Sequence, residues 1–318
     1  MLSDPRVTAC IVLYRTGEEA LNAVRCVQDA TEPVTLFVVD NAPKDSVADQ
    51  IARQCRGAKI ISMERNVGYG QGNNAVLPYL KSKYHLIMNP DVTFDPDLIT
   101  RMADWMDAHE DAVILTPKVV NLDGTEQFLP KRRPTIRYLL GGRRALKGDQ
   151  SAAQAEAAQL QADALAETAK AAWERHHAQR LGFADLMRCN RIEWRQSWQK
   201  AKARRLRDKA ARQRRWRNEY TLADQPPTEP MEVSFATGCF LFIRTHPFYR
   251  LGGFDRRFFL YQEDSDLSLS ALKFGKIVYH PDMVVTHAWH RDSAHELKQT
   301  LLHVWSTVLF FNKWGWKW

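Results

Sequence analysis

The sequence predicts an α/β fold in which a mostly parallel sheet is covered by helices on both faces, with a long helical insertion. Short apolar runs alternate with segments of helical spacing over residues 7–116. From about Gly142 to Tyr220 the composition changes to Ala, Gln, Glu, Lys and Arg without any proline. A chain of 318 residues with 45% hydrophobic residues is long enough to bury a sizeable core around such a sheet.

The first part of the chain predicts repeated strand–helix units. Apolar β-branched or aromatic runs predict strands at 7–14, 34–39, 59–62, 84–88 and 112–116. Helical spacing predicts helices at 18–30, 46–55, 72–82 and 96–108. Units of this length imply parallel strands, whose carboxyl ends collect ligands. Polar or aromatic side chains follow several predicted strand ends, namely Tyr14, Asp40, Asn66 and Asp91.

The insertion, which we delimit as residues 142–225, carries the positive charge of the protein. Thirteen Lys or Arg and two acids lie between Arg188 and Arg217, an excess larger than the net +8 of the whole chain. The rest is therefore net negative, which argues against nucleic-acid binding by the protein as a whole. The insertion fits a solvated hairpin whose Trp194, Trp198 and Trp216 pack on the main domain, a basic helix on an anionic membrane, or a helix that binds RNA or a protein partner.

The last part, 226–318, predicts a strand at 233–243 interrupted by Thr237-Gly238-Cys239, a helix at 266–274, and short extended pieces at 277–279 and 283–287. Residues 301–318 are rich in Trp, Phe and Lys, so they either cap the core or touch a bilayer interface. The five cysteines are scattered, and we find neither a leader segment nor an apolar run of membrane-spanning length. We expect a cytoplasmic protein, peripheral on the inner face of the cell membrane.

Two acidic sites point to chemistry. The segment 258–267 places Glu263, Asp264 and Asp266 directly behind an apolar, aromatic run. Low polarity and crowded like charges raise carboxyl pKa values toward the range useful for proton abstraction, although a helix start without catalysis has the same pattern. The second site, Asp91, ends an apolar strand where a metal-bound phosphate could be held. Together they suggest group transfer from a nucleotide-activated donor.

Several stretches, taken in order, resemble family 2 glycosyltransferases of the GT-A fold, and within them the bacterial rhamnosyltransferase-like enzymes of O-antigen and cell-wall assembly. The resemblance covers residues 6–130 and 232–295, leaving the insertion unmatched. Its elements are the strand ending in Tyr14, the segments 38–41, 66–74, 88–91, 252–255 and 259–267, and His287 ahead of Ser293. It implies a nucleotide-sugar-binding half at 1–141 and an acceptor and catalytic half at 226–318.

The resemblance also implies site residues. Donor binding falls on Tyr14, Asp40, Asn41, Asn66, Gly68, Gly70, Asn73, Asn74, Asn89 and Asp91. Asp40 would accept a hydrogen bond from the imide of uracil or thymine, although an Asp-Asn pair also forms turns. Asn89 stands where many GT-A enzymes carry the first acid of an Asp-x-Asp motif, which leaves Asp91 as the firm ligand of Mg²⁺ or Mn²⁺. His287 would be the second metal ligand; the alternative is a hydrogen-bonded core histidine.

By the same resemblance Asp264 is the catalytic base, Glu263 orients the acceptor, and Asp266 caps the following helix. Gly238, Cys239, Trp289 and His290 line the acceptor side. The expected function is an inverting transfer of L-rhamnose from dTDP-L-rhamnose onto a polyprenyl-linked glycan, with an anionic membrane held by the insertion and the C-terminal tail. Alternatives are a UDP-galactose or UDP-galactofuranose transferase, a nucleotidyltransferase, and a non-catalytic scaffold of a glycan-assembly complex.

Overall fold

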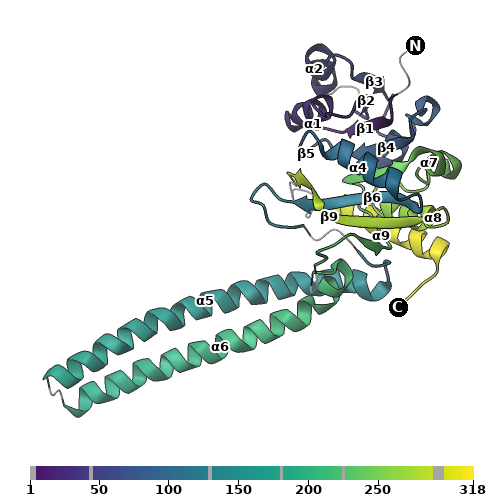
Figure 1. Cartoon of the computed structure of the whole chain (residues 1–318). Helices are drawn as coiled ribbons and strands as arrows, with labels where there is room; N and C mark the ends of the chain where they lie inside the picture. Colours follow the sequence, from purple (N-terminus) through teal and green to yellow (C-terminus); the bar gives the residue numbers. More distant parts are fainter. Residues whose placement is uncertain (1–4, 43–45, 128–130, 180–181, 224–225, 289–296) are drawn as a thin grey trace. The chain divides into compact units, whose positions relative to one another are not determined.

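The computed structural model describes residues 5–42, 46–127, 131–179, 182–223, 226–288 and 297–318 (Figure 1). The chain divides into two compact units. The first unit contains the residues up to Pro134 together with Thr221–Lys317, and the second contains Thr135–Tyr220. Among the described residues, no helix combines the length and apolar character that crossing a membrane requires.

The first unit is built on one mixed sheet. Its described strands are β1 (Val7–Leu13), β2 (Val34–Asp40), β3 (Lys59–Ser62), β4 (Tyr84–Met88), β5 (Val92–Phe94), β6 (Ala112–Val120), β7 (Met231–Val233), β8 (Phe240–Arg244) and β9 (Lys276–His287). They lie in the order β3-β2-β1-β4-β8-β6-β9-β5, with β7 also paired to β9. Strands β1 to β4, β6 and β9 run in one direction, whereas β5, β7 and β8 run in the other. The predicted mostly parallel α/β sheet is confirmed.

Helices cover both faces of this sheet (Figure 1). They are α1 (Glu19–Gln28), α2 (Ser46–Gln54), α3 (Tyr69–Asn74), α4 (Leu98–Ala108), α7 (Thr245–Leu251), α8 (Glu263–Ala271) and α9 (Leu297–Trp314), with a 3₁₀ turn η1 at Leu77–Tyr79. One apolar cluster joins α1, α2 and α4 to the alternate residues Val7, Ala9, Ile11 and Leu13 of β1. Cys10 and Val12, which point to the opposite face, join a second cluster. The buried strands thus show the two-sided apolar pattern of a covered sheet.

Some predicted boundaries were wrong. The helix expected at 72–82 begins instead at Tyr69 and ends at Asn74, and Pro78 then lies in the short turn η1, since proline cannot donate to a continuing helix. The strand expected at 233–243 is two strands, β7 and β8, in different places of the sheet. Conversely, the pieces expected at 277–279 and 283–287 form one strand, β9, whose register against β6 shifts between Pro117 and Lys118.

The second unit is a helical hairpin of α5 (Ile136–Gln179) and α6 (Phe183–Thr221), which run side by side (Figure 1). Its seam is made of small residues, chiefly Ala145, Ala155, Ala158, Ala162, Ala169 and Ala172 on α5 and Cys189, Ala203 and Ala210 on α6. Their spacing of three and four residues is that of a coiled coil, and alanine lets the helices approach closely. Trp194 and Trp198 are exposed on α6.

Candidate active site

The predicted site residues collect at one edge of the sheet because of its strand directions. β2 ends at Asp40, β4 ends just before Asn89 and Asp91, and β9 ends at His287, all at the carboxyl edge of strands that run the same way. β8 runs in the opposite direction, so Gly238 and Cys239, which precede it, meet the same edge. The backbone N–H of Asn89 donates to the carbonyl of Cys239 at 2.8 Å.

Asp91 and His287 form a pair at this edge. The His287 Nε2 atom lies 3.3 Å from Asp91 Oδ1, and both side chains are largely buried. On the other side of the ring, Nδ1 lies 3.0 Å from Gln127 Oε1. The Gln127 amide nitrogen donates to the carbonyl of His287 and to Asn121 Oδ1, which orients Oε1 toward the ring. His287 therefore donates from Nδ1 and directs Nε2 at the carboxylate.

This arrangement suits a divalent cation. The buried Asp91 Oδ1 has no hydrogen-bond partner among the described residues. The His287 Nε2 atom and that oxygen face each other, and the Asn89 amide nitrogen lies 3.5 Å from Nε2, so a cation bound here would have a nitrogen and an oxygen ligand. A ring whose far nitrogen donates to a fixed acceptor is the usual state of a metal-ligating histidine. Asp91 and His287 are two potential metal ligands. The described residues contain no group of three or more His, Cys, Asp or Glu arranged to hold a metal.

The acidic cluster opens α8 after a strained turn. Tyr261 and Gln262 have φ angles of 69° and 65°, a backbone state that costs non-glycine residues about 1–3 kcal/mol each. Asp264 accepts from the backbone N–H of Ser265 at 2.7 Å and of Gly238 at 3.3 Å. Glu263 is buried, and its Oε2 atom has no partner among the described residues. The turn thus presents two neighbouring carboxyl groups in very different surroundings.

Burial raises the pKa of both carboxyl groups. For Glu263, loss of solvent is the larger cause of the raised pKa and the charge of Asp264 the smaller. For Asp264, burial raises the pKa, whereas the nearby Lys131 ammonium and the two backbone N–H donors lower it. More groups that favour a charged carboxylate therefore surround Asp264 than Glu263, which has in their place one contact with its own backbone N–H. One proton shared by the pair belongs on Glu263, which leaves Asp264 as the ionised partner.

Gly238 and Cys239 connect the two acidic sites. Gly238 donates to Asp264, and Cys239 bonds through its carbonyl to Asn89, two residues before Asp91. Burial raises the pKa of the Cys239 thiol to about 12, and the charges of Asp91 and Asp264 both add to that rise. Because the adjacent residues Gly238 and Cys239 contact Asp264 and the backbone of Asn89, the predicted base and the segment of the predicted metal ligand lie on either side of this dipeptide.

Asn41, Asn66 and Gly68 form a closed network on the donor side. The Asn41 amide donates to Asn66 Oδ1 at 2.9 Å and to the carbonyl of Gly68 at 3.2 Å, and its own oxygen accepts from Val67 N–H. Asp40 is buried and accepts from the N–H of Ala42 at 3.0 Å, as a turn-forming aspartate does. Tyr14 is exposed beyond the end of β1.

The segment 66–74 packs against the second half of the chain. Gly68 has φ +89°, and a Cβ atom there would lie 2.1 Å from the carbonyl oxygen of Phe259, so only glycine fits. Gly70 likewise contacts the Phe254 side chain. The Asn74 amide donates to the carbonyl of Phe254 and accepts from its N–H, both at 2.8 Å. The Asn73 amide donates to the carbonyl of Tyr69, while its buried oxygen has no partner among the described residues.

Sequence reasoning missed several residues of this site and misassigned one. Gln127 and Lys131 come from irregular segments with no pattern that marks them. Asp266 does not cap α8, whose first residue is Glu263; its carboxylate instead accepts from Trp314 Nε1 at 2.7 Å and from Lys313 on α9. Trp289 and His290, expected on the acceptor side, lie outside the described residues.

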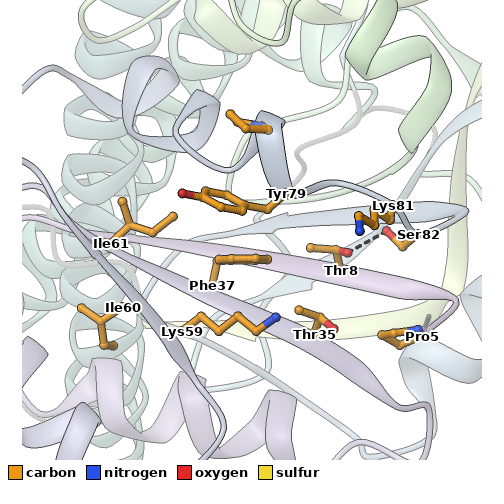
Figure 2. A pocket seen from close by; sticks show the side chains of 11 residues that line it. Pro5, Thr8, Thr35, Phe37, Lys59, Ile60, Ile61, Tyr79, Lys81 and Ser82 are labelled. Carbon is orange, nitrogen blue, oxygen red and sulfur yellow. Dashed lines mark hydrogen bonds between the residues drawn. The ribbon is translucent and has the colours of Figure 1, made fainter. Parts of the chain in front are cut away.

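A separate cavity of about 640 Å³ lies near the beginnings of the strands (Figure 2). Thr8 of β1, Thr35 of β2 and Lys59 of β3 line it together with Tyr79. The Thr8 hydroxyl donates to Ser82 Oγ at 2.7 Å. The lining continues to Phe37 on β2 and Ile61 on β3, and it contains none of the predicted site residues, so this cavity is distinct from the carboxyl-edge site.

Comparison with known proteins identifies relatives over most of the chain. The model of the family described as Glycosyl transferase family 2 matches residues 8–165. An N-acetylglucosaminyl-diphospho-decaprenol L-rhamnosyltransferase of Mycobacterium tuberculosis is 22% identical over 313 residues, which cover 94% of this chain and 81% of that protein. The family match includes Asp91 but ends before Asp264 and His287.

Solved structures share the fold. The mannosyltransferase PcManGT of Pyrobaculum calidifontis, in complex with GDP-Man and Mn²⁺, superposes with a TM-score of 0.53 at 13% identity over 98% of this chain. GalNAc-T7, with UDP, GalNAc and Mn²⁺, gives 0.52 at 12% identity over 92%. TarS of S. aureus gives 0.50 at 12% identity over 89%. The chain spans 64%, 45% and 37% of these three proteins, respectively. The predicted GT-A fold is confirmed.

Proposed function

Because the chain belongs to glycosyl transferase family 2, we propose that it transfers a sugar from a nucleotide-activated donor to a hydroxyl of a lipid-linked glycan, with inversion at the anomeric carbon. The observation that carries this proposal is that Gly238 and Cys239 contact both Asp264 and the backbone of Asn89, which lies two residues before Asp91 of the Asp91–His287 pair. The Asp91–His287 pair suits the diphosphate of a donor, and the Asp264 carboxylate suits an attacking alcohol. One centre then serves both substrates of a displacement.

Asp91 and His287 would hold the divalent ion, with donor phosphate oxygens completing its coordination. The ion supplies charge neutralisation for the departing nucleoside diphosphate. Imidazole favours Mn²⁺ over Mg²⁺, and Gln127 fixes the ring so that Nε2 is available. Asn89, in place of an acid, leaves the site with one carboxylate, so we expect a modest affinity for the metal alone and a higher one with donor present.

Donor recognition is assigned to the carboxyl ends of the first strands. Asp40 retains an oxygen beyond the one that binds Ala42, and that oxygen can accept from a pyrimidine imide N–H. Tyr14 can stack on the base, and Asn66 can reach the ribose. Asn41, Gly68, Gly70, Asn73 and Asn74 act in this proposal through the shape of the loop, since their described contacts are mainly to the protein backbone.

Asp264 is the proposed base. As the acceptor oxygen forms its bond to the anomeric carbon, the bond from that carbon to the donor's diphosphate oxygen breaks, and the hydroxyl proton passes to Asp264. Glu263, protonated, keeps the pair at a single negative charge and can orient the acceptor. Gly238 and Cys239 form the acceptor side through the backbone that positions Asp264. Attack from the face opposite the leaving group inverts the configuration.

L-rhamnose from dTDP-L-rhamnose is the proposed donor, and a polyprenyl-linked glycan the proposed acceptor. The support is the M. tuberculosis relative, whose name specifies an L-rhamnosyltransferase and a decaprenol-linked compound. UDP-galactose and UDP-galactofuranose are the competing donors, because a pyrimidine base would make the same hydrogen bond to Asp40.

The test is donor turnover. Purified protein with Mn²⁺ should release nucleoside diphosphate from dTDP-L-rhamnose faster than from UDP-galactose or UDP-galactofuranose. Asp264→Asn should lower that rate roughly 10²- to 10⁴-fold, while donor binding, followed as a thermal shift, stays unchanged. Asp282→Asn, an exposed acid on β9, is the matched control. Equal turnover in Asp264→Asn and the wild type removes Asp264 from the base role. No turnover with any donor, despite binding, favours a scaffold.

A further inference from the structure

Helix α9 presents an apolar stripe to the solvent. Leu301, Val304 and Trp305 are 60%, 44% and 62% exposed, and Val308 continues the stripe one turn later. These positions follow the i, i+3, i+4, i+7 spacing that places side chains on one face of a helix. With Leu302 they line a shallow hollow of about 540 Å³, whose lining among the described residues is formed by these side chains of α9. We call Leu301, Val304, Trp305 and Val308 the α9 stripe.

The opposite face of α9 is fixed to the catalytic segment. Phe310 and Phe311 are buried, and the Ser306 hydroxyl donates to the carbonyl of Leu260 at 2.7 Å. The rings of His303 and Tyr261 lie 5.1 Å apart, and Tyr261 precedes Glu263 by two positions. At the end of the helix Trp314 and Lys313 bind Asp266 of α8. The α9 stripe therefore lies on a helix whose buried face contacts the residues on either side of Glu263 and Asp264.

One exposed tryptophan and one exposed lysine follow the C-terminal end of the α9 stripe. Trp316 donates to Asn312, which lies one turn beyond Val308 on the same face. On the opposite face, Lys273 Nζ lies 5.8 Å from the Trp314 ring, and Lys313 and Arg257 both pair with Asp255. These ion pairs hold the pKa of Asp255 well below its usual range, so the network is fixed near neutral pH. Lys317 follows and is exposed.

We propose that the α9 stripe enters the outer acyl region of an anionic membrane leaflet and so holds the acidic cluster at the height of a lipid-linked acceptor's head group. An apolar helical face bordered by Trp and Lys is the composition of an interfacial helix, in which rings lie at head-group level and ammonium groups meet lipid phosphates. Exposed Trp305 and Trp316 together with Lys317 favour a lipid surface over a protein partner. The proposal rests on the proposed function for its acceptor, but vesicle binding tests it without catalysis.

The experiment is vesicle co-sedimentation of the full chain. The probe is vesicles of phosphatidylcholine with phosphatidylglycerol, used in high salt so that purely electrostatic binding is suppressed. Replacing Leu301 and Trp305 together by Gln should lower partitioning roughly tenfold or more, because two large apolar side chains no longer enter the lipid. Leu122→Gln is the matched control, since Leu122 is an even more exposed leucine (77%) of the same unit.

The outcomes are separable. Reduced vesicle binding with unchanged thermal stability supports the proposal, and single Trp305→Gln should fall between the wild type and the double variant. Equal binding by the double variant and the wild type overturns it. A shift from dimer to monomer in sedimentation velocity, without loss of vesicle binding, also overturns it in favour of a second copy of the chain. Nucleotide release from donor in lipid-free buffer should be unchanged by the Gln variants. If the wild type released no nucleotide from any donor, the proposed function would be contradicted, but the vesicle result would remain valid.

Discussion

At the scale of single residues, the site depends on two adjacent carboxyl groups that have different surroundings. Glu263 and Asp264 are adjacent carboxyl groups, yet Asp264 has two backbone donors and a nearby ammonium, whereas Glu263 has only the contact with its own backbone N–H. Burial raises the pKa of Glu263 above the ordinary 4.5, and this single contact opposes the rise only in part. The protein thus stores a proton next to its proposed base and avoids two buried charges side by side.

The raised pKa of Glu263 makes stability depend on pH. Between pH 4.5 and the folded-state pKa, the native protein binds a proton that the unfolded chain has already released. The contribution of protonated Glu263 to the free energy of unfolding is therefore complete below pH 4.5. It is lost as the pH rises, at a slope of up to about 1.4 kcal/mol per pH unit. We expect Glu263→Gln to flatten the decline of the melting temperature over this range. Parallel melting curves for variant and wild type would show that Glu263 ionises normally.

Gln127 is a positioning residue for the metal ligand His287. Replacing it with Met removes the acceptor for Nδ1–H and frees the ring, so we expect Mn²⁺ affinity in the presence of nucleoside diphosphate to fall roughly 10- to 100-fold by calorimetry. Gln127→Glu keeps the acceptor and should retain most of the affinity. Gln54→Met controls for loss of a glutamine, since Gln54 is exposed on α2. If the Met variant binds Mn²⁺ as the wild type does, His287 is a core histidine and not a ligand.

At the scale of elements, strand direction and helix seams are decisive. β8 runs against its neighbours, and this reversal brings Gly238 and Cys239 to the edge where β4 and β9 end. The hairpin shows a different principle, since its seam excludes large side chains and leaves leucines such as Leu146 and Leu160 on the outside. Close backbone packing replaces the usual leucine core.

The alanine seam can be tested by overpacking. Ala162 is fully buried between α5 and α6, so Ala162→Leu should destabilise the hairpin by about 1–3 kcal/mol. Ala164→Leu, two residues away on the exposed side of α5, should be nearly neutral and is the control. Thermal unfolding followed by helical circular dichroism measures both. An equal effect of the two substitutions would mean that α5 and α6 do not pack as a coiled coil in solution.

At the scale of the whole molecule, charge and apolar surface are separated between the two units. The exposed arginines of α6 supply a long-range attraction to anionic lipid, whereas the α9 stripe supplies short-range burial. The two contributions have different salt dependence, since screening weakens only the first. Membrane binding by this protein then has an electrostatic and an apolar contribution, and substitutions can remove each one separately.

Changing Arg204, Arg205 and Arg212 to Gln should lower binding to vesicles containing phosphatidylglycerol at low salt, at about 1 kcal/mol per cation near the surface. Binding at high salt should not change. A triple variant of the first unit, with Arg53, Arg56 and Lys59 changed to Gln, controls for net charge. Low-salt binding that is unaffected by the α6 substitutions would return the hairpin to a structural or protein-binding role.

The sequence by itself determined the alternation of strands and helices, the helical insertion and the two acidic sites. These follow from local periodicity and composition, which act over a few residues. It placed Asp91, His287 and Asp264 in one site only through resemblance, and it assigned Asp266 to a helix cap although that residue anchors α9. Only the tertiary structure decided that Gln127 orients His287, that Asn74 fixes the Phe254 backbone, and which face of α9 is buried. Each of these depends on contacts between residues 47 to 180 positions apart, for which local sequence carries no signal.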